Sequence, residues 1–231
     1  MFAVNTNGTG FTNLHSFMGF TGGSDGASPW AGLIVSGNTL YGTEIFGGSS
    51  AMGTVFAVNT DGTGFTTVYS FLGDSDGGSP HCGLILSGNT LYGTAQNSGS
   101  SGHGTVFAVN TDGTGFTTLY SFTASSNSTN SDGAWPSAGL ILSGNTLYGT
   151  AAGGGSSGQG TVFSLSLPPP SLTIALTGNQ AVLFWSASAT NYILQSTTNL
   201  ASPNLVTASD AVPVIAFTVT NTSPARFFRL Q

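Results

Sequence analysis

Gly-Leu-Ile-Leu-Ser-Gly-Asn-Thr-Leu-Tyr-Gly-Thr, at residues 83–94, recurs unchanged at residues 139–150 and with one substitution at residues 32–43. In each copy two short apolar runs flank a Ser-Gly-Asn turn. Gly and Asn tolerate the positive φ that a tight hairpin turn needs. Each copy therefore predicts a β-hairpin, and the main body of the chain is one supersecondary unit used several times.

A second repeated block follows the first. Gly-Thr-Val-Phe-Ala-Val-Asn-Thr-Asp-Gly-Thr-Gly-Phe stands at residues 53–65 and 104–116, and its turn leads into a strand of alternating character, so it predicts a second hairpin. Each repeat then has four short strands. Leu40 to Leu91 spans 51 positions and Leu91 to Leu147 spans 56. This period is typical of a kelch-like β-propeller blade and favours it over a right-handed β-helix, whose units are shorter.

A third motif, Asp-Gly-x-x-Pro-x-x-Gly-Leu, precedes each hairpin, at residues 25–33, 76–84 and 132–140. Together with Gly-Asn-Thr-Leu-Tyr-Gly-Thr, a Gly-rich loop and Gly-Thr-Val-Phe, it resembles the GloVer-type tandem repeats of choice-of-anchor bacterial surface or secreted proteins. The resemblance covers residues 1–165. It implies a propeller-like array that is exported and held by a variable C-terminal anchor, and it brings no known catalytic residues.

The fold class we expect is all-β, with three domain-level segments. Residues 1–167 predict a hairpin, two four-stranded blades and a three-stranded blade, about three blades in all. Closed propellers usually need four or more blades, so we expect a fragment of a larger propeller whose open blade edges invite self-association. Residues 168–171 form a Pro-rich linker. Residues 172–231 predict a small β-sandwich.

The C-terminal module resembles a shortened fibronectin type III domain. Val182–Trp185 and Tyr192–Gln195 are similar to its B and C strands, and Trp185 would fill the core. Arg226 and Arg229 are expected on a solvated strand face.

Composition excludes some functions. Arg226 and Arg229 are the only basic side chains and the formal net charge is −6, whereas nucleic-acid binding needs several Lys or Arg. No apolar run is long enough for a transmembrane helix. Met1 falls where Val55 stands in its repeat, so we expect an N-terminally truncated chain from a longer exported protein, extracellular or at the cell surface, whose signal peptide is absent here.

Loops that differ among the repeats gather on one face, because strands alternate in direction. This loop face comprises residues 18–31, 72–82 and 123–138 between blades and 44–52, 95–103 and 151–159 within them. Variable loops on a fixed scaffold usually carry recognition. The candidate ligand-binding residues are Trp30, His81, His103 and Trp135. Exposed aromatics there would suit stacking on sugar rings, and the alternative is that both Trp pack beneath their own loops.

Acidic residues on the loop face offer a candidate metal site. Asp74-Ser75-Asp76-Gly77 resembles the start of a calcium loop, although the downstream bidentate Glu is lacking. Calcium is the one cofactor we consider. Asp25, Asp76 and Asp132 are repeat-equivalent, which indicates a shared structural duty such as capping a turn.

Cys82 takes the position of Ala31 and Ala138, so it is expected to be a small buried residue. His15 replaces Tyr69 and Tyr120 in its strand, which indicates a packing substitution.

Two functions fit these features. The first is a non-catalytic extracellular or cell-surface repeat protein for attachment, which binds a carbohydrate or a protein through the loop face. The alternative is a propeller-type polysaccharide hydrolase or lyase. Glycosidases need two carboxylates in unlike roles, and no Gly-x-Ser-x-Gly stands between a strand and a helix. We therefore favour the first function, and a purely structural spacer is the third option.

Overall fold

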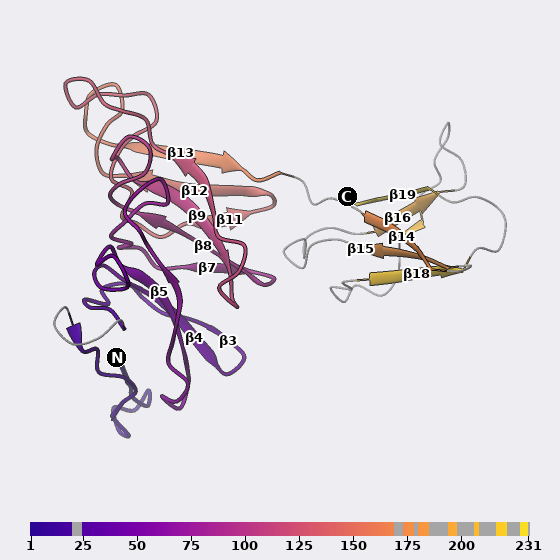
Figure 1. Ribbon diagram of the computed structural model, residues 1–231, viewed down its shortest axis with the longest axis horizontal. Helices are drawn as coiled ribbons and strands as arrows, with labels where there is room; N and C mark the ends of the chain where they lie inside the picture. The colour runs from indigo at the N-terminus through magenta and orange to yellow at the C-terminus, as the bar shows by residue number, and fades with distance from the viewer. Residues whose placement is uncertain are drawn as a thin grey trace. The chain divides into compact units, whose positions relative to one another are not determined.

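The computed structural model describes residues 1–19 and 25–168, together with the backbone of six later strands. The chain forms two compact units, which are treated separately below. The first consists of Met1–Leu86 and Thr90–Leu167, and the second contains Pro168–Gln231. All of the strands from β1 to β13 belong to the repeats (Figure 1).

The repeats form separate small antiparallel sheets, each in chain order. The N-terminal hairpin pairs β1 with β2, the first and second sheets have four strands each, and the third has three. The strands of the hairpin and first sheet are β1 Phe2–Ala3, β2 Thr12–Asn13, β3 Ile34–Ser36, β4 Thr39–Glu44, β5 Thr54–Asn59 and β6 Thr66–Ser70. Those of the second and third are β7 Ile85–Ser87, β8 Thr90–Ala95, β9 Thr105–Asn110, β10 Thr117–Ser121, β11 Ile141–Ser143, β12 Thr146–Ala151 and β13 Thr161–Ser166.

The turns follow from the repeated sequence. Gly88 in the Ser-Gly-Asn turn has φ of 59°, a conformation that side chains other than Gly, Asn and Asp rarely adopt. In the second hairpin, the Asp61 carboxylate accepts hydrogen bonds from the Thr63 amide at 2.9 Å and the Thr63 hydroxyl at 2.7 Å. These bonds lower the pKa of Asp61. The turn is thus held by local polar contacts and needs no help from the core.

The sheets pack face to face. One core cluster joins Tyr41, Val55 and Ala57 of the first sheet to residues of the second, among them Leu91 and Phe107. The opposite face of the second sheet contributes Tyr92, Val106 and Ala108 to another cluster, which it shares with Leu147 and Ala151 of the third. The second sheet is therefore apolar on both faces, as a blade between two neighbours must be.

Aromatic rings repeat across each boundary between sheets. Phe17 lies 5.5 Å from Phe56, Phe71 lies 5.1 Å from Phe107, and Phe122 lies 5.2 Å from Phe163, all measured between ring centroids and all edge-on. In each pair the first Phe ends one repeat and the second belongs to the Gly-Thr-Val-Phe of the next. The same contact therefore joins successive repeats, and the predicted β-propeller-like array is confirmed.

The C-terminal unit holds two three-stranded antiparallel sheets, ordered β14-β15-β18 and β17-β16-β19. Their bounds are Thr173–Thr177, Gln180–Phe184 and Ala216–Thr220 for the first, and Val206–Thr207, Leu194–Thr197 and Phe227–Leu230 for the second. Two small sheets are what a short β-sandwich requires. Trp185 and Arg226 lie outside the described residues, and so does the expected linker after Pro168. The resemblance to fibronectin type III stays a prediction.

The part of the chain that the structure describes has no helix with the length and apolarity needed to cross a membrane.

Phe107 tests the packing between sheets, because it is fully buried and meets Phe71. We expect Phe107→Ala to lower the free energy of unfolding by about 3–5 kcal/mol, measured by urea unfolding followed by circular dichroism. Phe2 has the same place in its repeat but is 61% exposed, so Phe2→Ala should cost less than about 1 kcal/mol. Equal losses would contradict face-to-face packing.

Candidate functional site

Loops of neighbouring segments are tied together on the loop face. Isolated antiparallel bridges pair Ala27 with Phe46, Gly78 with Asn97, and Ala134 with Gly153, so each loop before a blade contacts the loop within that blade. The candidate ligand-binding residues are carried by these paired loops. The structure therefore gives them a fixed support.

Trp30 and His81 form the first aromatic pair. Their ring centroids are 5.6 Å apart and the rings stand at 81°. Trp30 is 75% exposed, the highest value among the aromatic residues that the structure describes. Partial burial lowers the pKa of His81, which favours the neutral imidazole. The alternative that Trp30 packs beneath its own loop is wrong, because most of its indole surface is open to water.

His103 and Trp135 form the second pair. Their ring centroids are 6.0 Å apart and the rings are nearly parallel, at 16°. The Trp135 amide donates a hydrogen bond to the His103 carbonyl at 2.9 Å. Trp135 has φ of 58°, and a Cβ on Gly153 would lie 2.6 Å from its ring. Trp135 therefore packs against Gly153 of the neighbouring loop at residues 151–159 and is 42% exposed, so more than half of this side chain is covered, but by a neighbouring loop and not by its own.

His103 is also held by two polar contacts. Its Nδ1 lies 2.6 Å from the Ser101 carbonyl and its Nε2 lies 2.8 Å from the Ser125 hydroxyl. Because a carbonyl only accepts, Nδ1 carries the proton, and in the neutral ring Nε2 accepts from Ser125. A serine hydroxyl bonded to an imidazole nitrogen is also the contact that a nucleophile makes with its general base. No pattern in the sequence pointed to Ser125, because it stands in a loop that differs among the repeats.

The repeat aspartates have a structural duty, as their equivalence predicts. The Asp76 carboxylate accepts hydrogen bonds from the Tyr69 hydroxyl at 3.0 Å, the Leu72 amide at 2.8 Å and the Asp74 amide at 3.2 Å. Leu72 and Asp74 lie in the loop that leads into the second sheet, whereas Tyr69 lies in β6. The carboxylate thus fixes the loop to the strand before it.

Asp132 does the same one repeat later. It accepts from the Tyr120 hydroxyl at 2.7 Å and the Thr123 amide at 2.8 Å. Burial, and then the bond to Asp132, raise the pKa of Tyr120 to about 12. Burial raises the pKa of Asp132, but the Thr123 and Tyr120 donors outweigh it, so this pKa is lowered. The carboxylate is therefore ionised at neutral pH and acts as an acceptor only.

The predicted calcium site uses a carboxylate that already has three donors. Asp76 accepts two amide protons and one hydroxyl proton, and the Asp74 carbonyl accepts from the Gly99 amide at 2.8 Å. Within residues 1–19 and 25–168 and the described later strands, no group of three or more His, Cys, Asp or Glu side chains is arranged to hold a metal ion. Calcium binding here remains a hypothesis.

Cys82 is buried and free, as its equivalence to alanine predicts. The Thr94 amide donates to its Sγ at 3.0 Å. Burial raises the pKa of the thiol, so it stays protonated at neutral pH and has little nucleophilic character. Cys82 is part of the packing.

Glu44 departs from the repeat most clearly. The equivalent residues are Ala95 and Ala151, yet the Glu44 side chain is fully buried rather than exposed on the loop face. Its Oε2 accepts a hydrogen bond from the Thr54 hydroxyl at 2.6 Å, while Oε1 is buried without a partner. Burial above all, and nearby Asp25, raise the pKa of Glu44 to about 8. An acid in an alanine position was the sequence signal that could have identified it.

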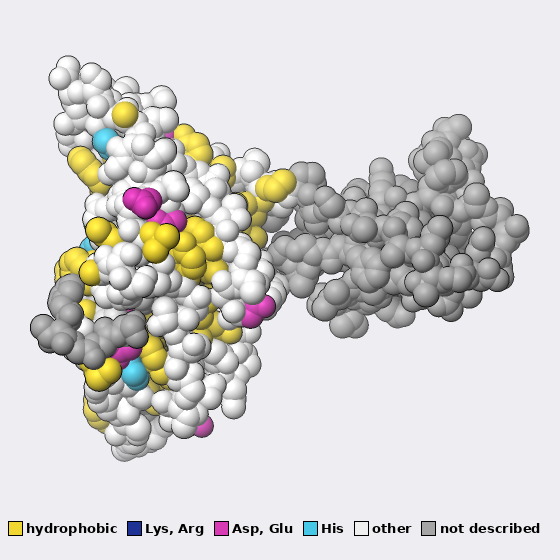
Figure 2. Space-filling view, in the orientation of Figure 1, with side chains coloured by type: hydrophobic (Ala, Val, Ile, Leu, Met, Phe, Trp, Pro, Cys, Tyr) yellow, Lys and Arg dark blue, Asp and Glu magenta, His cyan; other side chains and the backbone are white. Residues whose placement is uncertain are grey.

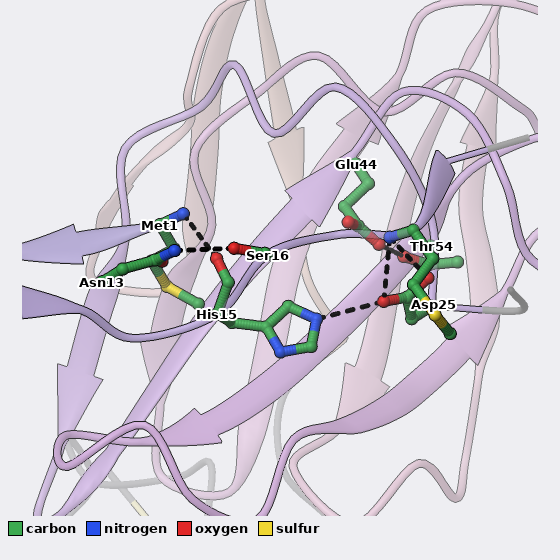
Figure 3. Close-up of polar contacts among 8 residues, drawn as sticks. Met1, Asn13, His15, Ser16, Asp25, Glu44 and Thr54 are labelled. Atoms are coloured by element: carbon green, nitrogen blue, oxygen red, sulfur yellow. Dashed lines mark hydrogen bonds and ion pairs between the residues drawn. The ribbon is translucent and has the colours of Figure 1, made fainter.

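His15 also lies beside Asp25 (Figure 3). Its Nε2 is 3.1 Å from the Asp25 carboxylate, in the place that Tyr69 and Tyr120 take beside their own aspartates. His15 also stacks on Phe65, with centroids 3.9 Å apart, so the expected packing role is confirmed. The first repeat thus has a His–Asp–Glu group where the next two have Tyr–Asp–Ala.

Stacked four-stranded sheets with a loop face define a β-propeller-like repeat protein. The sequence matches the family described as the Gloeobacter/Verrucomicrobia repeat over residues 1–199, and the chain belongs to this family. The match covers the repeats and extends past Leu167 into the second unit. It supports the repeat resemblance drawn from the motifs.

None of the curated proteins matches the chain. Among solved structures, one from a nidogen/laminin complex is similar, with 16% identity and a TM-score of 0.35 over 80% of this chain and 61% of that one. A gluconolactonase from Xanthomonas campestris has 18% identity and a TM-score of 0.36, over 67% of this chain and 53% of that one. The chain thus spans less than two thirds of either, and these likenesses carry no argument about its role.

Glu44 makes stability depend on pH. Its pKa is raised to about 8 in the folded chain and is near 4.3 when unfolded, so folding takes up a proton between these values. Stability is then full at low pH and falls as pH rises through this window, by up to about 1.4 kcal/mol per unit. We expect Glu44→Ala to remove this fall and to stabilise the chain at pH 8.

Urea unfolding of both proteins at intervals from pH 5 to pH 9 measures this effect. Asp61→Ala, at an exposed turn, is the control and should keep the loss of stability between pH 5 and pH 8. Parallel curves for the wild type and Glu44→Ala would show that the buried carboxyl does not titrate in this window.

Proposed function

We propose that the chain is a non-catalytic extracellular or cell-surface protein that binds a neutral carbohydrate through its loop face. The observation that carries this proposal is the Trp30 indole, which is 75% exposed at a loop supported by paired neighbours. Trp is enriched where proteins contact other molecules, because it combines a large apolar ring with a hydrogen-bonding N–H group. Its flat apolar surface is suited to the C–H face of a sugar ring.

The charge of the loop face supports a neutral ligand. No Lys or Arg occurs between residues 1 and 167, so an anionic sugar would find no cation there. Asp25, Asp76 and Asp132 already accept hydrogen bonds within their own repeats. Figure 2 shows a described surface with few magenta carboxylates, much of it white, the colour of the backbone and of side chains such as Ser, Thr and Asn. Hydroxyl and amide groups of this kind pair with sugar hydroxyls.

Export and attachment belong to the same proposal. The resemblance to choice-of-anchor proteins suggests a chain that is carried out of the cell and held there by a C-terminal anchor. The low charge and the many Ser, Thr, Asn and Gly residues are common in extracellular β-proteins. Carbohydrate binding would then attach a cell to a glycan surface.

A second candidate function is hydrolysis of a polysaccharide. A glycosidase needs two carboxylates in unlike roles. The three repeat aspartates instead share one role, which is to hold their loops in place, so they do not support glycosidase chemistry. The hydrogen bond between Ser125 and His103 favours a different chemistry. The serine hydroxyl would attack an acetyl ester on the glycan while the imidazole takes its proton and passes it to the sugar oxygen that leaves. Water would then hydrolyse the acetyl-serine to acetate and free serine. The second candidate function is therefore hydrolysis of an ester group carried by a polysaccharide.

A glycan array, followed by titration of intrinsic fluorescence with the best neutral oligosaccharide, tests binding. We expect Trp30→Ala to weaken binding by about 3- to 10-fold, and Trp135→Ala to weaken it less, because half of that ring is already covered. Phe11→Ala, which removes a 67% exposed ring from the N-terminal hairpin, is the matched control and should leave affinity unchanged. Wild type that binds no neutral glycan would refute the proposal.

The same glycans, acetylated or not, separate the two functions. Release of acetate that is lost in Ser125→Ala and kept in Ser126→Ala would support ester hydrolysis. Binding without release supports the first function.

Calorimetric titration tests the calcium hypothesis at Asp74 and Asp76. If the site exists, calcium gives a saturable heat with one ion per chain, and Asp74→Asn removes this heat while Asp61→Asn, at an exposed turn, keeps it. The absence of heat at millimolar calcium would remove the hypothesis.

A further inference from the structure

Among residues 1–19 and 25–168, nothing covers one apolar face of the third sheet. Along β12 and β13 every second residue is exposed, and these residues lie on one face because Tyr148 pairs with Ser164 and Thr150 with Val162. Ile141 of β11 pairs with Tyr148 and so lies on the same face. We call Ile141, Tyr148, Thr150, Val162 and Ser164 the open face.

The same residues are buried in the two earlier sheets. Val55 and Val106 are 0% exposed, whereas Val162 is 82% exposed. Tyr148 is likewise 43% exposed, and its equivalents in the first and second sheets belong to the core clusters. Composition cannot explain the difference, since β12 repeats the Thr-Leu-Tyr-Gly-Thr of β4 and β8. The open face is a repeat interface without its neighbour.

The structure also shows what covers this face elsewhere. In the first sheet, Tyr41 and Val55 are covered by Leu91, Phe107 and Val109 of the second sheet. The covering surface is the opposite face of the following repeat. The chemistry of the missing partner is therefore known from the two interfaces that are formed.

The N-terminal hairpin presents that covering surface without a partner. Phe2, Val4 and Phe11 stand where Phe107, Val109 and Phe116 stand in the second sheet, and they are 61%, 48% and 67% exposed. Phe2 already stacks on Phe11, with centroids 5.2 Å apart at 28°, much as Phe107 stacks on Phe116 at 5.9 Å and 19°. The hairpin is thus preformed in the conformation that the internal interface uses.

We infer that the open face of one chain binds the N-terminal hairpin of a second copy, head to tail. Phe2 and Val4 of one copy would pack on Tyr148 and Val162 of the other, as Phe107 and Val109 pack on Tyr41 and Val55. None of these side chains carries a charge, so no ion needs to lose its water on contact. The binding is hydrophobic and depends neither on the loop face nor on the proposed carbohydrate ligand.

Two different surfaces meet in this interface, so each copy in a pair keeps one free surface, and the pair has one free surface at each end. Heterologous contacts of this kind build open chains or closed rings rather than a symmetric dimer. A variant that loses one surface can still use the other. This property distinguishes specific head-to-tail binding from non-specific hydrophobic aggregation.

Sedimentation velocity of the full chain at increasing concentration makes the test. We expect wild type to grow beyond a dimer between about 10 and 500 µM. Val162→Asp alone and Phe2→Asp alone should stay monomeric. An equimolar mixture of the two should form dimers and stop there, because each variant supplies the surface that the other lacks.

Leu72→Asp is the matched control, since it puts the same charge on a side chain that is 54% exposed in a loop. It should associate as wild type does. The replaced side chains in all three variants are exposed, and circular dichroism should show unchanged strand content. A monomeric wild type at 500 µM overturns the inference, as does association that persists in Val162→Asp or a mixture that stays monomeric.

Discussion

The structure depends on packing between the faces of successive sheets. Each sheet is small and apolar on both sides, so it cannot bury its own surface and needs a neighbour on each face. The edge-on Phe pair at each boundary, with centroids 5.1–5.5 Å apart, is the most regular form of this contact. Backbone hydrogen bonds hold each sheet together, and the aromatic contacts make an array of them.

The loops are positioned by a second, polar system. The repeat aspartates bind the strand that ends one repeat, through Tyr69 and Tyr120, and the first amides of the following loop. Bridges between loops then join each loop to the next blade. Because these contacts are the same in the second and third repeats, the loops vary in sequence without losing their support. The loops that carry the two Trp–His pairs are held by these repeated contacts.

In the first repeat, two substitutions are enough to change this polar system. His15 takes the place of a tyrosine and Glu44 the place of an alanine, and both lie near Asp25 (Figure 3). The imidazole keeps the stacking contact, with Phe65 as partner. Burial raises the pKa of the Glu44 carboxyl to about 8, so the group stays protonated at neutral pH. In the first sheet, a buried protonated carboxyl group thus takes the place of the methyl group of an alanine.

The sequence by itself determined the strands, the turns and their grouping into small sheets, because hairpins are set by residues close together in the chain. It also predicted that the aspartates share one duty, since they share one position. Only the tertiary structure decided that Trp30 meets His81, that His103 meets Ser125, that Glu44 is buried and that Val162 is exposed. These outcomes depend on what lies across a boundary between repeats. Val106 and Val162 are identical residues with opposite surroundings because, among the described repeats, only Val106 faces a neighbouring sheet.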